Sequence, residues 1–98
     1  MLEIDIGDDG VVVLAGRLDA SQSEKAQSFL DSVADASILD FKNLEYISSA
    51  GLGVLLRTQK RLMASGGSLK LVNVNKHIMD VFRFSGFDHI FDLKAAGS

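Results

Sequence analysis

The sequence predicts a single α/β domain: a mixed, mostly parallel sheet that begins with a hairpin and is flanked by three or more helices. Short apolar segments with strand-like patterns alternate along the chain with longer segments whose apolar residues recur at helical spacing. Hydrophobic residues make up 47% of the 98 residues, enough for a packed core. No repeat or linker interrupts the pattern, so residues 1–98 are expected to form one domain.

The predicted hairpin occupies the first fifteen positions. Residues 2–6 alternate apolar and acidic side chains, which is typical of a half-buried strand. Gly7–Gly10 has the composition of a tight turn, and Val11–Ala15 is a short apolar run that would return alongside the first strand.

A helix is expected next, over residues 21–34. Ser21-Gln-Ser-Glu24 matches the S-x-x-E capping box, and apolar residues behind it follow the i, i+3, i+4, i+7 pattern. Ser37–Phe41 is then predicted to be a short central strand that leads through a polar turn to a second helix.

The second helix is predicted over residues 49–64 and ends at the glycines of Ser65–Gly67, which tolerate left-handed geometry. Basic residues gather in its C-terminal half, where the helix dipole favours cations. Its expected apolar stripe consists of Leu52, Leu55, Leu56, Leu62 and Met63.

The rest of the chain repeats the strand–helix alternation. Ser68–Val74 is predicted to be a strand, and Asn75 the cap of a third helix that stops at Ser85–Gly86. Ile90–Leu93 is expected to form a short last strand, and Lys94–Ser98 a frayed tail.

Composition excludes several classes of function. The net charge of −3 and the lack of a basic run do not support nucleic-acid binding. There is no cysteine, no apolar stretch near the ~20 residues that span a bilayer, and no signal peptide, so we expect a cytoplasmic protein without membrane insertion. His77 and His89 have no carboxylate or cysteine at ligand spacing, so no metal site, cofactor or catalytic centre is expected.

Two adjacent hydroxyls, Ser48 and Ser49, stand where the second helix begins. A helix N-terminus carries unpaired N–H groups and a partial positive charge, so a serine there can serve as a cap or accept a phosphoryl group. Both interpretations stay open at this point. Gly51 and Gly53 would let the helix approach the sheet closely, and Asp19 is expected in a loop on the same rim of the sheet.

The run Leu39–Leu56 resembles the signature of STAS domains, and is most similar to the bacterial anti-sigma factor antagonists. Further resemblance lies in Ala15–Asp19, Gly66–Val72 and Val81–Phe87, so it extends over nearly the whole chain. It implies a mixed sheet flanked by helices, no catalysis and no cofactor. It also implies two partners: an anti-sigma factor that is a serine kinase of the histidine-kinase-like ATPase type, and a PP2C-type phosphatase.

Aligned on its Gly-Leu-Gly triplet, the family pattern places the phosphoacceptor at Ser49, with Ser48 as the alternate because it replaces the usual aspartate. Ala50 also departs from the serine or threonine that is common at its position. An accessory subunit docked on a membrane transporter ATPase of the lipid-uptake type is the alternative. The expected partner-binding residues are Asp19, Ser21, Ser48, Ser49, Gly51, Gly53 and Arg57.

Overall fold

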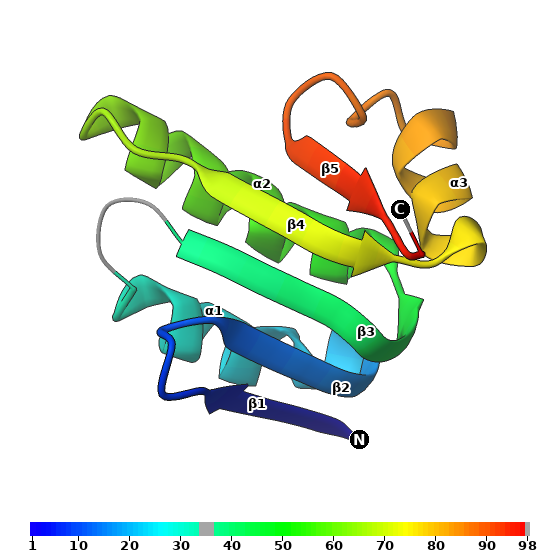
Figure 1. Cartoon of the computed structure of the whole chain (residues 1–98), viewed down its shortest axis with the longest axis horizontal. Helices are drawn as coiled ribbons and strands as arrows, with labels where there is room; N and C mark the ends of the chain where they lie inside the picture. Colours follow the sequence, from blue (N-terminus) through cyan, green and yellow to red (C-terminus); the bar gives the residue numbers. More distant parts are fainter. Residues whose placement is uncertain (34–36, 98) are drawn as a thin grey trace.

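One five-stranded sheet organises the protein, and its strands follow the order β1-β2-β3-β4-β5 (Figure 1). The computed structural model describes residues 1–33 and 37–97. The elements are β1 (Leu2–Ile6), β2 (Val12–Leu18), the 3₁₀ turn η1 (Ala20–Gln22), α1 (Ser23–Asp31), β3 (Ser37–Ile47), α2 (Ser49–Ala64), β4 (Leu69–Val74), α3 (Lys76–Phe84) and β5 (Asp92–Ala95).

The topology is that of the predicted α/β domain. Strands β1 and β2 pair antiparallel as a hairpin, whereas β2–β3, β3–β4 and β4–β5 pair parallel, each connected through a helix. Helices α1 and α2 lie behind the sheet in Figure 1, and α3 lies beside the end of the sheet formed by β4 and β5. The predicted mixed sheet, N-terminal hairpin and flanking helices are confirmed.

The core lies between the sheet and these helices. It is built from the apolar residues that alternate along the strands and from the inner sides of the helices, with Phe41 and Phe82 among its largest members. The Phe82 and Phe91 rings meet edge to face with their centroids 5.4 Å apart. Packing of this kind supplies most of the free energy that fixes α2 against the sheet.

The end of α2 and the start of α3 follow their sequence signals. Gly66 has a φ of +84°, and the amide of Gly67 donates to the carbonyl of Leu62 at 2.8 Å, which closes α2 as predicted. The Asn75 side chain accepts the amide hydrogen of Ile78 at 2.9 Å and so caps α3.

Three strand predictions were wrong in their bounds. Strand β2 runs from Val12 to Leu18 and so extends three residues beyond the predicted end at Ala15. Strand β3 continues to Ile47 instead of ending at Phe41 in a polar turn, because residues 43–47 pair with β2 and Leu44 and Ile47 are buried in the core. Register shifts within β2–β3 mark where the pairing is irregular. Strand β5 lies two residues later than expected, and the amide of Ala96 donates to the carbonyl of Val74 at 2.9 Å, so the chain is paired there instead of frayed. Ser98 lies outside the described residues.

The first helix and the stripe of α2 also need correction. Helix α1 is shorter than the predicted 21–34, since it begins at Ser23 and ends at Asp31, and position 34 lies outside the described residues. The capping box does not form, because the Ser21 hydroxyl donates to the Asp19 carboxylate and the chain enters through η1. Met63 was predicted to belong to the apolar stripe of α2, but its side chain is 57% exposed, so that part of the prediction was wrong.

Candidate functional site

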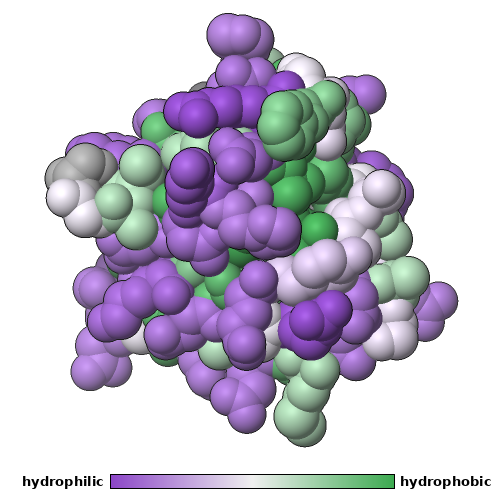
Figure 2. Space-filling view, turned by 90° about the vertical axis from the view of Figure 1, so that its right-hand side faces the viewer, coloured by the Kyte–Doolittle hydropathy of each residue, from purple (hydrophilic) through white to green (hydrophobic). Residues whose placement is uncertain are grey.

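The site lies at the edge of the sheet where β2 and β3 end, on the right-hand side of Figure 1. The Ser48 amide donates to the carbonyl of Leu18 at 2.9 Å, so the end of β2 is bonded to the residue that precedes α2. Figure 2 turns this side toward the reader and shows apolar surface among polar side chains. A region of mixed polarity at the ends of parallel strands is where α/β domains commonly bind other molecules.

Gly51 sets the distance between α2 and this edge. A Cβ built on Gly51 would lie 2.7 Å from the Leu18 carbonyl oxygen and 3.0 Å from Cγ1 of Ile47. No larger residue fits while the helix keeps its position, so the expected close approach at Gly51 is confirmed. The start of α2 is thereby held against the ends of both β2 and β3.

Ser48 and Ser49 occupy different positions on α2. Ser48 is the N-cap: it has extended backbone angles, is half-buried, and its hydroxyl oxygen accepts the Gly51 amide hydrogen at 3.2 Å. Ser49 is the first helical residue and is exposed. Within the described residues, its hydroxyl forms no hydrogen bond. One serine therefore caps the helix, and the other presents its alcohol to solvent.

Asp19 and Ser21 lie next to this edge because they follow β2 directly and η1 lies against α2. The Ser21 hydroxyl donates to Oδ1 of Asp19 at 2.7 Å. This hydrogen bond is the main reason why the pKa of Asp19 is lower than usual; the positive charge of the N-terminal amino group and, least of all, that of Arg17 act in the same direction. Asp19 is therefore a carboxylate at neutral pH and adds a negative charge beside the start of α2.

The other two predicted partner-binding residues lie farther along α2. Gly53 is half-exposed, and a Cβ there would meet the end of the Arg57 side chain at 3.4 Å and no atom of the sheet. The close approach to the sheet that was also expected at Gly53 was therefore wrong. Arg57 is exposed and its Nε donates to Oε1 of Gln27 at 3.0 Å, which joins α2 to α1. The structure thus gives Arg57 a structural contact, and its role in partner binding stays a prediction.

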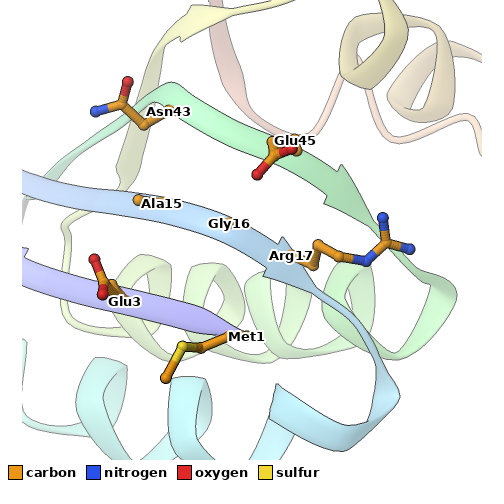
Figure 3. A pocket seen from close by; sticks show the side chains of 7 residues that line it. All are labelled: Met1, Glu3, Ala15, Gly16, Arg17, Asn43 and Glu45. Carbon is orange, nitrogen blue, oxygen red and sulfur yellow. The ribbon is translucent and has the colours of Figure 1, made fainter.

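Arg17 was not singled out by the sequence, although it lies in the Ala15–Asp19 motif. It is exposed at the end of β2, and its guanidinium carbon lies 4.4 Å from the centroid of the Tyr46 ring on β3. The pairing of β2 with β3 places these two residues side by side. Figure 3 shows the Arg17 side chain directed along β2 toward the edge of the sheet that carries the site.

The open face of the sheet carries a shallow groove of about 390 Å³ next to Arg17 (Figure 3). Its floor is formed by Ala15 and Gly16, and the side chains of Glu3 and Glu45 flank it from β1 and β3. In the described part of the chain, no three histidines or carboxylates gather as potential metal ligands. No helix there is long and apolar enough to span a membrane.

Comparison with known proteins identifies similar sequences and folds. The family model described as "Mlab, STAS domain" matches residues 4–93. The chain is 36% identical to BtrV of Bordetella bronchiseptica, provisionally named an anti-sigma factor antagonist, over 85% of this chain and 77% of that protein. It is 34% identical to the anti-sigma-B factor antagonist of Bacillus subtilis, over 86% and 80% respectively.

A solved structure agrees with these sequence matches. A Thermotoga maritima protein, also provisionally named an anti-sigma factor antagonist, superimposes with a TM-score of 0.78 and 26% identity. The match covers 96% of this chain and 86% of that protein. The arrangement of sheet and helices described above is therefore shared with solved proteins of that name.

Proposed function

Because this chain belongs to the STAS domain family, among the bacterial anti-sigma factor antagonists, we propose that it works by partner switching. In its unmodified state it binds an anti-sigma factor that is also a serine kinase of the histidine-kinase-like ATPase type. The kinase transfers the γ-phosphoryl group of ATP to Oγ of Ser49, which loses its proton, and ADP leaves. The phosphorylated protein dissociates, and a PP2C-type phosphatase hydrolyses the phosphoserine. We expect this cycle in the cytoplasm, with the chain as binding partner and substrate rather than as an enzyme.

The observation that carries the proposal is the exposed hydroxyl of Ser49 at the first position of α2, which forms no hydrogen bond to any residue that the structure describes. A kinase can reach this alcohol without disturbing the cap, because the Ser48 hydroxyl supplies the hydrogen bond to Gly51. The same contact favours Ser49 over Ser48 as the acceptor. The partial positive charge of the helix N-terminus accommodates a phosphate at this position.

The docking surface that we propose surrounds Ser49. Asp19 and Ser21 lie on one side, and the first turn of α2 with Gly51 and Gly53 lies on the other. A phosphoryl group adds about −1.5 to −2 charges there, beside the existing charge of Asp19. A partner that covers Ser49 would then face repulsion and a desolvation cost. A loss of about 2 kcal/mol weakens a complex roughly 30-fold, enough for a switch.

The test is a kinase reaction. We would incubate the chain with a candidate anti-sigma factor kinase of the histidine-kinase-like ATPase type from the same organism and with labelled ATP, and map the product by mass spectrometry. Wild type and Ser48→Ala should incorporate phosphate at position 49, and Ser49→Ala should not. The affinity of the kinase for the unmodified chain and for the isolated phosphorylated chain is then measured, and the phosphorylated form should bind at least 30-fold more weakly.

Two outcomes contradict the proposal. Labelling that persists in Ser49→Ala would remove Ser49 as the acceptor. Equal affinity of the two forms would show that phosphorylation does not release the partner. Thermal unfolding of each variant serves as the folding control, because the exposed Ser49 side chain can be shortened without disturbing the core.

A second function is favoured by one finding, namely that the matching family model is described as "Mlab, STAS domain". In this alternative the chain is an accessory subunit docked on a membrane transporter ATPase of the lipid-uptake type, and the face around α2 is a permanent interface. Co-purification with such an ATPase at fixed stoichiometry, unchanged by Ser49→Asp, would support this alternative against partner switching.

A further inference from the structure

We propose that Arg17, held on the ring of Tyr46, is a cationic anchor of the docking surface and binds a carboxylate of the partner protein. This inference rests on the proposed function, since it assigns a role within the surface around Ser49. It adds a residue that lies outside α2 and that the expected partner-binding set did not contain.

The position of Arg17 is the first reason. Arg17 is two residues before Asp19, and its ring partner Tyr46 is two residues before Ser48. The pairing of Leu18 with Ile47 and the bond from the Ser48 amide to the Leu18 carbonyl bring both segments to the same edge.

The second reason is that the Arg17 guanidinium has no ion-pair partner among the described residues. Within the described residues, the ion pairs are Asp80–Arg83 and Asp88–His89, so no carboxylate of the chain pairs with Arg17 there. Glu45 lines the same groove without forming such a pair. The planar cation rests on an aromatic face instead, with its N–H groups free for a planar acceptor.

Stacking on Tyr46 prepares Arg17 for binding. An arginine that is already restrained loses less side-chain entropy when it forms a bidentate pair with a carboxylate. Arginines at the centre of an interface are among the residues whose removal weakens binding most. Because Asp19 is negative and Arg17 positive, the rim offers both signs of charge, which would fix the orientation of one partner.

The experiment measures the affinity of the unphosphorylated chain for the kinase that phosphorylates it in the test above, at several salt concentrations. Arg17→Gln should weaken binding roughly tenfold or more and flatten the salt dependence. Tyr46→Leu keeps the charge but removes the stacking surface, so it should weaken binding less than Arg17→Gln. Lys42→Gln is the matched control, since it removes one positive charge from an exposed side chain on β3 and should stay within twofold of wild type.

The outcomes separate this inference from the proposed function. Suppose that the wild-type complex forms and is lost on phosphorylation, while Arg17→Gln binds as well as Lys42→Gln. The proposal that Arg17 anchors the partner is then wrong, and the proposed phosphorylation switch is supported. If wild type does not bind the kinase at all, both fail. As a folding control, the melting temperatures of Arg17→Gln and Tyr46→Leu must match that of wild type within a few degrees. Arg17→Lys keeps the positive charge but lacks the planar guanidinium, so it should retain only part of the wild-type affinity.

Discussion

The two glycines in the first turns of α2 allow a direct test of how the helix start is placed. In Gly51→Ala the new methyl group would lie 2.7 Å from the Leu18 carbonyl oxygen and 2.8 Å from Cγ of Leu18. The oxygen belongs to the backbone and accepts the Ser48 amide, so it cannot move without breaking that bond. In Gly53→Ala the nearest atom is Nη1 of Arg57 at 3.4 Å, the end of a long side chain that can turn away.

Opposite effects on stability follow from this difference. Replacing glycine by alanine inside a helix gains about 1 kcal/mol, so Gly53→Ala should be stabilised by up to about that amount. Overpacking costs about 1–3 kcal/mol, and contacts this short with backbone place Gly51→Ala toward the upper part of that range. After the helix gain is subtracted, Gly51→Ala should lose about 1–2 kcal/mol.

Urea unfolding of both variants and wild type measures these differences, with melting temperature as a second readout. For a domain of this size, 1 kcal/mol corresponds to a shift of about 4–8 °C. Gly51→Ala should therefore melt below wild type and Gly53→Ala at or above it. If the two variants shift in the same direction by the same amount, the close approach of Gly51 to β2 does not determine the stability of the helix start.

Three further predictions concern single contacts. Ser48→Ala should lower the free energy of unfolding by about 1 kcal/mol because the cap of α2 is lost, whereas Ser49→Ala should stay within about 0.5 kcal/mol in the same urea titration. Ser21→Ala should raise the pKa of Asp19, followed by carboxyl NMR; since the folded pKa is lowered, the contribution of Asp19 to stability is present above its unfolded pKa and disappears as pH falls through the folded pKa. Gly16→Ala should be strongly destabilised in thermal unfolding, because φ is +98° and the new methyl group would collide with the carbonyl oxygen of Met1.

Local signals predicted those parts of the fold that local contacts determine. The bounds of α2 agree with the prediction, because a hydroxyl cap begins the helix and Gly66 ends it, and both act within one turn. The second half of β3 was missed for the opposite reason. Lys42, Asn43 and Glu45 give this segment the composition of a turn, but pairing with β2 holds it in an extended strand, and a distant strand leaves no local signal.

Contacts with other segments explain the burial of Gln59, and a bond within the helix satisfies Thr58; the predicted apolar stripe of α2 omitted both residues. Gln59 is 3% exposed, and its amide bridges two backbone groups, accepting from the Leu69 amide at 2.7 Å and donating to the Ile90 carbonyl at 2.8 Å. Thr58 is buried and donates to the carbonyl of Val54 at 2.9 Å. A pattern based on hydrophobicity assigns such residues to the surface, because their partners appear only in the folded chain.

The candidate site shows the same difference between features set by local sequence and features set by contacts between distant segments. The serine pair and the expected rim acid could be found from sequence because each is adjacent to the end of a predicted element. The prediction of a capping box at Ser21 was wrong, because the Ser21 hydroxyl donates its hydrogen bond to the carboxylate of Asp19, two residues earlier. Arg17 was missed since its partner Tyr46 is on another strand.

The separation of roles between Ser48 and Ser49 explains how a modification could change binding without unfolding the protein. If the exposed hydroxyl were also the cap, adding a phosphoryl group would put the capping bond worth about 1 kcal/mol at risk together with the packing of Gly51. Here the capping oxygen belongs to Ser48, and the Ser48 amide is bonded to β2, so both contacts remain when Ser49 is altered. The added charge lies at the positive end of α2, where it is tolerated within the chain. Its cost would then fall on whatever covers Ser49, as a phosphorylation switch between two proteins requires.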